Sequence, residues 1–516
     1  MDTILPSKSE GAAKRKPVLS FSQVIHMNVG FFGIQYSFAL QQSAVNPIYD
    51  MLGADPHQIP ILNLAGPMTG LLIQPIIGAM SDKTWSPTFG RRKPYFLIGA
   101  ILCSVCLLIY PFSSSLWMAA GLLWLLDAGN NTAMEPYRAF IVDKLDSRQQ
   151  SIGFQAQSFF TGFGQTLANI SLFVFPLLFV GVTGSLPNWV YASFFLGAVC
   201  SVGSMWWSMR TTPEIPPDDE EIKLIMAYNE GKPPKVIQLL GVILILTLPL
   251  WLGLILVYWA NMPVSFPFMG FLIFPWISFL YIFIKQNSAS HFSKWLGDWL
   301  APITEIIDAI REMPKVMWQL ALVYIFQWYA LFCYWQNSAK SVALSVWNAT
   351  PKNNPELYEE AVGWTGLVNG WYNIVTFMTA FMLVSFTKKL GPKKIHFVCL
   401  ILAAVGFLAF PLLTNKFLLL VAITGFGIGW ASIMGIPYLL VVDKIPAARY
   451  GVYMGIINMM IVIPMIIQTL SFGYVLENFL DNDPRNAITF AAVLLLVAAL
   501  LTLGIGTKSK SYSTIS

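Results

Sequence analysis

Residues 136–144 read PYRAFIVDK, and residues 437–444 read PYLLVVDK. Each stretch closes an apolar run, so that Pro-Tyr followed by Val-Asp-Lys occurs twice in the chain, about 300 residues apart. A weaker echo lies upstream, where FGRRK at 89–93 corresponds to LGPKK at 390–394. These repeats predict that the chain contains two related halves.

The composition excludes a water-soluble protein. Of the 516 residues, 56% are hydrophobic and 11% are charged, whereas soluble domains carry about 25% charged residues. Continuous apolar stretches such as 236–258 and 488–505 exclude disorder, and they also exclude a membrane β-barrel, whose strands alternate between apolar and polar residues. The sequence therefore predicts an all-α polytopic membrane protein.

Apolar runs long enough to cross a bilayer predict fourteen membrane spans. They cover residues 22–47, 58–80, 95–113, 116–142, 152–180, 188–209, 236–259, 263–285, 315–340, 361–387, 394–412, 417–442, 451–476 and 487–506. The long polar stretch between the sixth and seventh spans is rich in proline and acid and is interpreted as a linker. Because the fourth span pairs with the twelfth in the repeat, two six-helix halves with two inserted spans follow, which resembles the major facilitator architecture.

The predicted organisation has seven parts. These are an N-terminal tail at 1–20, an N-terminal half at 21–209, a linker at 210–235, inserted spans at 236–285, an amphipathic segment at 286–314, a C-terminal half at 315–506 and a C-terminal tail at 507–516. In the amphipathic segment Trp295, Trp299 and Ile303 share one face, which suits an interfacial helix on the cytoplasmic leaflet. A short cytosolic packing helix is the alternative interpretation.

The distribution of basic residues predicts the orientation. With the N-terminus inside, every lysine and arginine falls in a cytoplasmic segment except Arg138, which lies within a span, and a set of four on the outside: Lys340, Lys352, Lys416 and Arg485. The basic N-terminal tail lacks the apolar core of a secretory signal. We therefore expect a multi-pass protein of the cell (inner) membrane with both termini in the cytoplasm. The five cysteines lie in or beside apolar segments, so no disulfide framework is predicted.

The fourth predicted span carries ionisable residues at membrane depth. An acid there costs roughly 2.5–3.5 kcal/mol on insertion scales, so that Asp127 is a candidate functional residue. At helical spacing Asp127, Asn131 and Arg138 share one face, and Glu135 lies three residues from Arg138, within reach of an ion pair. A carboxylate that takes up a proton and reorganises its partners could couple transport to protons. A structural ion pair between helices is the alternative.

The loop after the second span joins an acid to a cluster of bases. Asp82, Arg91 and Arg92 lie in a tight cytoplasmic loop, where charges could pair across the two halves when that side closes. We interpret them as a cytoplasmic gate, with a basic anchor at the lipid headgroups as a compatible alternative.

Polar side chains recur at helical spacing on other spans, which indicates a wet cavity. Amides and hydroxyls with few charges, together with tryptophan rings, suit a neutral polyhydroxylated ligand such as a sugar. The candidate substrate-binding residues are Gln35, Gln42, Asn131, Gln165, Trp328, Asn369, Tyr372 and Asn373. Hydrogen bonding between helices is the alternative role of these polar side chains.

Several motifs resemble those of the plant sucrose–proton symporters and their animal and bacterial relatives, in the glycoside–pentoside–hexuronide branch of the major facilitator superfamily. The motifs are GIQYSFALQ at 33–41, GP at 66–67 through QP at 74–75 to Asp82, FGRRKP at 89–94, LDAGNN at 126–131 ending in PYRA at 136–139, and GIINMMIVIP at 455–464. We expect a bacterial member of this group.

This resemblance implies a disaccharide–proton symporter in which Asp127 matches the family's proton-binding aspartate and Arg138 the arginine eleven residues on. The second span contains no acid, so the paired aspartates with which melibiose-type relatives bind sodium are absent. The sequence departs from the plant pattern at 332–340, where the charged residues at the end of the plants' seventh helix are missing, and in the inserted spans at 236–285.

The function predicted from the sequence is import of a disaccharide of the sucrose or maltose type with protons, by alternating access. Transport of another neutral glycoside or a nucleoside, or sensing of a sugar without transport, are the alternatives. No nucleophile–base pair and no metal-ligand spacing is found in the sequence, so an enzyme and a metal site are not predicted. We expect a monomer in the lipid bilayer that binds a small sugar and protons, with no cofactor beyond the proton gradient and no nucleic-acid partner.

Overall fold

The computed structural model describes residues 16–52, 65–184, 186–230, 232–246, 248–249, 273–350 and 353–506. Helices dominate these residues, and two short strands, β1 (Val182–Thr183) and β2 (Leu186–Pro187), pair in an antiparallel hairpin. Nine of the described helices are long and apolar enough to cross a membrane by length and composition. The chain is a multi-pass membrane protein, as the sequence predicts.

Six long helices form the N-terminal group. They are α1 (Phe21–Met51), α3 (Ala65–Asp82), α4 (Lys93–Ile109), α5 (Leu116–Lys144), α6 (Gln150–Leu178) and α7 (Asn188–Thr211). Each overlaps one of the first six predicted spans. Of these, α1, α3 and α5 fall outside the nine most apolar helices, because amide and charged residues interrupt their apolar runs.

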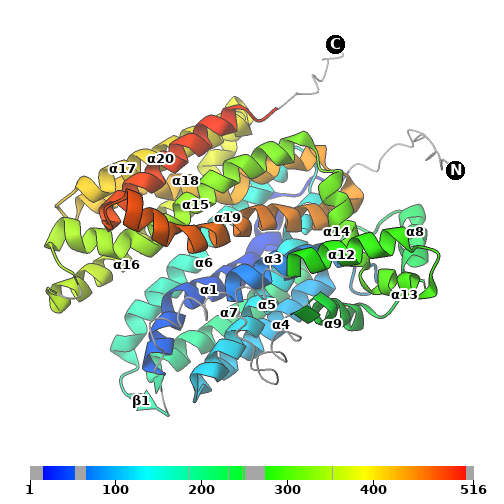
Figure 1. Ribbon diagram of the computed structural model, residues 1–516, viewed down its shortest axis with the longest axis horizontal. Helices are drawn as coiled ribbons and strands as arrows, with labels where there is room; N and C mark the ends of the chain where they lie inside the picture. The colour runs from blue at the N-terminus through cyan, green and yellow to red at the C-terminus, as the bar shows by residue number, and fades with distance from the viewer. Residues whose placement is uncertain are drawn as a thin grey trace.

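Six further long helices form the C-terminal group. They are α15 (Lys315–Val342), α16 (Pro355–Leu390), α17 (Pro392–Ala409), α18 (Leu418–Val441), α19 (Tyr450–Phe479) and α20 (Pro484–Leu503). Short helical turns η1 (Tyr110–Phe112) and η3 (Phe410–Leu412) extend α4 and α17, and η2 (Ala343–Trp347), η4 (Val442–Lys444) and η5 (Ala447–Arg449) lie at helix ends. The two groups form the two sides of the bundle in Figure 1.

The same helix pairings occur within both groups. In the N-terminal group α1 packs on α6 and α7, α4 on α5 and α7, and α3 on α5. In the C-terminal group α15 packs on α19 and α20, α17 on α18 and α20, and α16 on α18. The repeated motifs therefore occupy equivalent helices, with Pro136 inside α5 and Pro437 inside α18.

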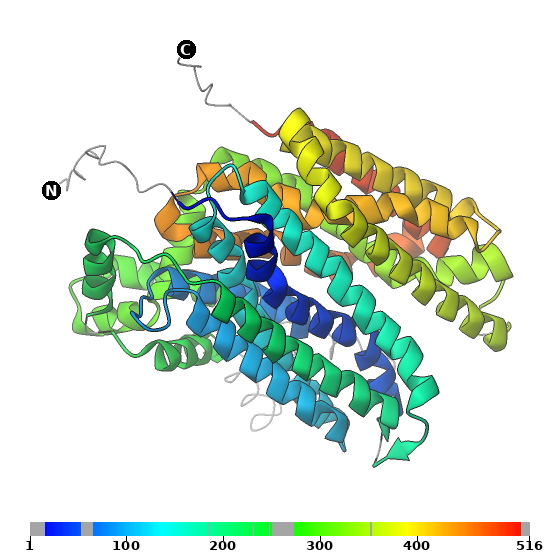
Figure 2. The same cartoon turned by 180° about the vertical axis from the view of Figure 1, so that it is seen from behind.

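The groups meet along two symmetric seams. The helix α3 packs on α19, and its counterpart α16 packs on α6. Glycines allow the helices of the bundle to approach closely, as expected where van der Waals packing replaces the hydrophobic effect. A Cβ at Gly162 in α6 would lie 2.7 Å from the backbone oxygen of Asn373 in α16. Figure 2 shows α6 running beside α16 along this boundary.

Five shorter helices connect the groups. They are α8 (Asp219–Asn229), α9 (Lys235–Leu246), α12 (Ile273–Gln286), α13 (His291–Trp299) and α14 (Ala301–Arg311). They gather at the end of the bundle where α1 begins and α20 ends, which we call the terminal end (Figure 1). The helices α9 and α12 overlap the two predicted inserted spans, and residues 247 and 250–272 of this segment lie outside the described residues.

Two segments differ in detail from the sequence prediction. The stretch interpreted as a linker contains the helix α8, which begins at the N-cap Asp218. The single amphipathic helix expected over 286–314 is divided into α13 and α14 at Leu300. Pro302 accounts for the break, because a proline is tolerated in the first turn of a helix but not in its interior.

Candidate functional site

The carboxyl group of Asp127 is buried in α5 and has no counter-charge among the described residues. Its side chain is 2% exposed, and its Oδ1 has no hydrogen-bond partner among the described residues. None of the ion pairs within the described ranges involves Asp127. Gly66 of α3 lies opposite, where a Cβ would approach Oδ2 to 3.6 Å. A buried carboxylate without a cation is unfavourable in its charged form, so that this position favours uptake of a proton.

The other two residues predicted to take part in proton coupling, Glu135 and Arg138, are paired with each other. Arg138 Nη1 donates to Glu135 Oε1 within α5, and both side chains are buried. The guanidinium also lies over the ring of Tyr438 in α18, 5.1 Å from its centroid. Arg138 therefore connects the N-terminal group to the C-terminal group, whereas Asp127 stands apart from this pair.

The amides beside Asp127 are occupied by contacts between helices. Asn131 Nδ2 donates to Thr69 Oγ1 at 2.9 Å, and Gln74 Nε2 donates to Asn131 Oδ1, so that this amide joins α5 to α3. Asn130 Nδ2 donates to Ser37 Oγ in α1 at 2.9 Å. The oxygen of the Gln74 amide has no partner among the residues described.

The structure separates the glutamines predicted to bind substrate. Gln165 Nε2 in α6 donates to Gln35 Oε1 in α1 at 3.0 Å, and both side chains are buried. Gln42 lies two turns further along α1 and is exposed. The helical spacing that placed Gln35 and Gln42 on one face is correct, but only Gln35 reaches a buried polar contact.

The predicted residues of α16 lie together in the C-terminal group. Tyr334 of α15 donates its hydroxyl to Asn369 Oδ1 at 3.0 Å, and Asn373 Nδ2 donates to the backbone oxygen of Asn369 at 3.0 Å. The Oδ1 of Asn373 lacks a partner within the described ranges. Tyr372 is buried with its ring 4.7 Å from that of Phe426.

Three indole rings form a cluster next to these residues. Trp328 and Trp335 of α15 and Trp430 of α18 have ring centroids between 5.5 and 6.5 Å apart. The indole N–H groups of Trp328 and Trp430 are buried and lack hydrogen-bond partners within the part of the chain that is described. Buried indole N–H groups usually find a partner, so that this cluster has donors available for a ligand.

Trp430 was missed by the sequence analysis, although the repeat contained a signal for it. The offset that aligns Pro437 with Pro136 places Trp430 at the level of Gly129, within one turn of Asp127. By contrast, the side chains of Trp371 and Trp124 are 39% and 40% exposed.

Further buried amides of the bundle are unsatisfied. Gln155 and Gln157 of α6 and Gln327 of α15 are fully buried or nearly so, and neither end of any of these side chains has a partner among the described residues. Gln155 lies at the seam between the groups, where a Cβ at Gly435 of α18 would approach its Nε2 to 3.0 Å. Buried polar groups are generally hydrogen-bonded, so these amides point to water or a polar ligand in the bundle.

The predicted gate residue Asp82 connects the two groups at the terminal end. Its carboxylate accepts hydrogen bonds from the backbone N–H groups of Gly451 and Val452, both at 2.9 Å, at the start of α19. Arg92 pairs with Asp82 at 2.6 Å and with Asp143 at 2.8 Å, and its side chain is fully buried. A carboxylate at a helix N-terminus is stabilised by the free N–H groups and the helix dipole.

Among the described residues, the hydrogen bonds and ion pair of Arg91, the third predicted gate residue, are made with the linker. Its guanidinium pairs with Glu221 of α8, and its backbone N–H donates to Glu214 at 2.8 Å. Glu214 also accepts from the backbone N–H groups of Arg92 and Lys93, so that it caps α4. The positive φ of Gly90, 81°, turns the loop toward this carboxylate.

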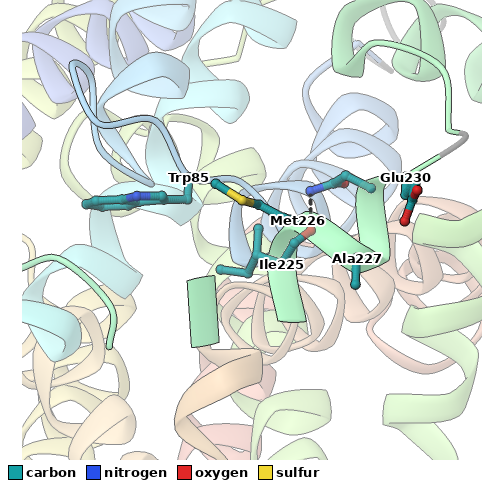
Figure 3. A pocket seen from close by; sticks show the side chains of 6 residues that line it. Trp85, Ile225, Met226, Ala227 and Glu230 are labelled. Atoms are coloured by element: carbon teal, nitrogen blue, oxygen red, sulfur yellow. Dashed lines mark hydrogen bonds between the residues drawn. The ribbon is translucent and has the colours of Figure 1, made fainter. Parts of the chain in front are cut away.

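A shallow hollow of about 510 Å³ lies beside this loop. Figure 3 shows Trp85 of the loop facing Ile225 and Met226 of α8 across it. None of the predicted substrate-binding residues lines it. The hollow therefore belongs to the contact between the linker and the loop.

Comparison with known proteins adds family evidence to this geometry. The model of the Major Facilitator Superfamily matches residues 27–469, with a further match over 341–513. The chain is 32% identical over 166 residues to the sucrose transport protein SUT3 of Oryza sativa subsp. indica, which covers 28% of this chain and 32% of that protein. It is 33% identical over 133 residues to the sucrose transport protein SUC3 of Arabidopsis thaliana, covering 22% of each. The matched segments thus span about a third or less of these curated relatives.

Solved structures of low sequence identity share the fold. The proton:xylose symporter XylE, bound to 6-bromo-6-deoxy-D-glucose, is similar with a TM-score of 0.56 and 13% identity, over 94% of this chain and 95% of that chain. The human organic anion transporter MFSD10 is similar with a TM-score of 0.58 and 13% identity, over 94% of this chain and all of that chain. These similarities concern the arrangement of helices alone.

Proposed function

Because the chain belongs to the Major Facilitator Superfamily, we propose that it is a secondary active transporter that imports a disaccharide of the sucrose or maltose type together with protons. Its family also places it among transport proteins and outside the enzymes, as the sequence predicts. The segmental similarity to sucrose transport proteins supports the choice of sugar class.

The observation that carries the proton coupling is the isolated burial of Asp127. Its carboxyl group has no cation among the residues described, whereas Glu135 and Arg138 of the same helix neutralise each other. A proton is then the means by which Asp127 becomes neutral, and a carboxyl group that exchanges a proton in one conformation can couple its movement to transport.

We place the sugar between the groups, at mid-depth of the bundle. In this proposal Gln35, Gln165 and Asn131 contribute amides from the N-terminal group, and the C-terminal group contributes the residues Trp328, Asn369, Tyr372, Asn373 and Trp430. The Oδ1 of Asn373 and the indole N–H groups of Trp328 and Trp430, which lack partners among the described residues, suit the hydroxyls of a sugar, and aromatic rings suit its apolar faces. Gln42 is left out because it is exposed.

The proposed orientation places the terminal end in the cytoplasm. Lys83, Arg91, Arg92 and Lys144 all lie at that end, where the positive-inside rule expects basic residues. The closed contact of Asp82 with α19 then describes a conformation in which the cytoplasmic side is shut. We further propose that the transporter acts as a monomer in the cell membrane.

The test is uptake of labelled sucrose and maltose into proteoliposomes with an imposed inward proton gradient. For the unchanged chain we expect accumulation that an uncoupler abolishes. In Asp127→Asn we expect accumulation to be lost while exchange of internal and external sugar continues, because the neutral amide mimics the protonated acid. The control Glu356→Gln, at an exposed position of α16, should accumulate sugar normally.

Two results would contradict the proposal in different ways. Normal accumulation in Asp127→Asn would show that coupling occurs elsewhere. Absence of transport of both sugars by the unchanged chain would reopen the substrate class.

A further inference from the structure

The segment between the two groups, α9 to α14, reaches both of them at the terminal end. The helix α14 packs on α3 of the N-terminal group and on α19 of the C-terminal group. The helices α9, α12 and α13 pack on one another, and α13 also packs on α14. The helix α14 therefore lies across both groups, and any relative movement of the groups at this end changes its contacts.

One face of α14 is fixed to α12. Asp308 Oδ1 accepts from the hydroxyl of Tyr281 at 2.6 Å, and Oδ2 pairs with Lys285 at 2.9 Å. Arg311 Nη1 donates to the same hydroxyl at 2.9 Å. Although burial alone raises the pKa of Asp308, the hydrogen bonds from Tyr281 and Lys285 hold this pKa below its usual value. The anchor therefore consists of charge-assisted hydrogen bonds.

The helix α13 is fixed to both inserted helices. Gln238 Nε2 of α9 donates to the backbone oxygen of Asp298 at 2.8 Å. The ring of Trp299 lies directly against Gly241 of α9, where no side chain would fit. Ser293 donates to the backbone oxygen of Ile284 in α12 at 3.2 Å. The two inserted helices and α13 thus form a packed support for α14.

The opposite face of α14 is apolar and buried against the bundle. Ile303, Ile306 and Ala309 are at most 8% exposed and belong to the same core cluster as residues of α3 and α19. Tyr453 of α19 donates its hydroxyl to the backbone oxygen of Ala309 at 3.3 Å. Burial of each such side chain contributes to holding α14 across the seam.

Two acids, Glu305 of α14 and Glu312 directly after it, pair with basic residues of the two groups. Glu305 Oε1 lies 3.5 Å from Lys83, in the loop after α3, and 3.9 Å from Arg449, just before α19. Glu312 pairs with Arg449 at 2.6 Å. One carboxylate, Glu305, therefore lies between a base of the N-terminal group and a base of the C-terminal group.

From these contacts we infer that α14, held by the inserted helices α9 and α12, is a strap that keeps the terminal end closed, in addition to the Asp82 contact. The inference rests on the proposed function, since alternating access requires this end to open. Opening separates the start of α19 from the loop after α3, and α14 cannot keep its contacts with both. The strap therefore stabilises the closed conformation and makes opening slower.

The test measures the distance between the groups at the terminal end by electron spin resonance. Spin labels are attached at Thr88→Cys and Lys389→Cys, which are exposed positions of the two groups. The full chain is used in liposomes, with its five native cysteines replaced by serine. No substrate is required, so the readout does not depend on which sugar the protein carries.

Two variants weaken the strap in different ways. Glu312→Arg places a second positive charge beside Arg449. It should raise the ratio of the open to the closed population about three-fold, as expected for a half-exposed pair. Ile306→Ala removes a buried side chain and should raise the ratio about ten-fold or more. The control Glu360→Gln breaks an exposed ion pair with Lys416 at the other end of the bundle and should leave the ratio unchanged.

Two substitutions, at Glu305 and at its partner Arg449, test the contribution of this ion pair. Arg449→Gln removes one of the two cations of Glu305 and should favour opening, because an incompletely neutralised acid remains in the closed state. Adding Glu305→Gln should suppress part of this effect, which a double-mutant cycle detects. Additive effects of the two changes would count against the strap.

The outcomes separate the strap from the transport proposal. Unchanged distances in both Glu312→Arg and Ile306→Ala, in protein that elutes as a monodisperse helical species, would overturn the inference. An equal shift in Glu360→Gln would overturn it as well, because the effect would not be specific to the strap. If the distances shift as expected while neither sugar is transported, the strap stands and the proposed substrate fails.

Discussion

The carboxylate of Asp82, the last residue of α3, accepts a hydrogen bond of 2.9 Å from the backbone N–H of Gly451, at the start of α19. The two residues are 369 positions apart in the chain, and their contact closes the terminal end of the bundle. Arg92 neutralises the same carboxylate from behind, at 2.6 Å. At the closed end, one buried acid thus accepts hydrogen bonds from a helix N-terminus and forms an ion pair with an arginine.

Asp82→Asn should shift the conformational equilibrium toward an open terminal end. The amide is neutral and leaves Arg92 buried with Asp143 as its remaining acid, which costs about 3–5 kcal/mol by analogy with broken buried pairs. The measurement is the spin-label distance between positions 88 and 389. Asp483→Asn, which breaks an exposed pair with Arg485, serves as the control and should change little.

Gly78→Ala should also prevent closure, for a steric reason. A Cβ at this position would collide with the backbone oxygen of Gly451, so α3 and α19 would have to move apart. We expect uptake to fall at least about ten-fold, since a shift of 1.4 kcal/mol already corresponds to that factor. The control Gly473→Ala, in the facing helix α19, has no atom within 4 Å of the new Cβ and should transport normally. Equal loss in both variants would contradict this explanation.

Trp430→Phe should weaken sugar binding more than turnover. The substitution keeps an aromatic ring in the cluster with Trp328 and Trp335 but removes an indole N–H that is buried without a partner among the residues described. Loss of one hydrogen bond to a ligand costs about 0.5–1.5 kcal/mol, which corresponds to a two- to twelve-fold rise in KM. Uptake kinetics measure it, and Trp117→Phe, at a 75% exposed position, is the matched control. An unaltered KM would remove Trp430 from the proposed site.

Glu214→Gln should destabilise the protein without acting on substrate. Its carboxylate accepts three backbone hydrogen bonds of 2.8–2.9 Å at the start of α4, and an amide oxygen replaces only part of this interaction. We expect a loss of about 1–2 kcal/mol, as for a helix N-cap, seen as a lower Tm in detergent. Glu220→Gln, an exposed neighbour in α8, should leave the Tm unchanged, and an equal drop in both would refute the capping role.

Acidification should favour the closed terminal end through Glu305. Burial raises the pKa of this carboxyl group above its ordinary value, outweighing the bases Lys83 and Arg449, while the nearby Asp82 raises it further. The closed state therefore binds a proton at a pH where an exposed glutamate is still charged, and its stabilisation is lost as the pH rises through the raised pKa.

The measurement is the distance distribution as a function of pH. The closed fraction should increase as the pH falls toward the ordinary glutamate value of about 4.3. Glu305→Gln should remove this part of the pH dependence. The facing Tyr228, whose pKa is raised by burial and by Glu305, stays neutral throughout and does not contribute. An identical pH profile in Glu305→Gln would contradict the assignment.

Much of the helical architecture could be predicted from the sequence. Apolar runs mark helices because a bilayer offers no partner for backbone N–H and C=O groups, so each segment must satisfy them internally. The motif repeat ending at Lys144 and Lys444 also identified α5 and α18 as equivalent helices, which the matching contacts of the two groups confirm. The Glu135–Arg138 pair could also be predicted, because residues three apart lie on neighbouring positions of a helix surface.

What only the tertiary structure decided are the contacts between segments distant in sequence. Helical spacing could not separate the exposed Gln42 from the buried Gln35, turn Arg91 toward Glu221, or bring Trp430 to Trp328, because the rotation of a helix is set by its packing against neighbours. The same holds for Glu305 between Lys83 and Arg449. The sequence by itself thus determined which segments form helices, while close packing of the helices decided which side chains meet.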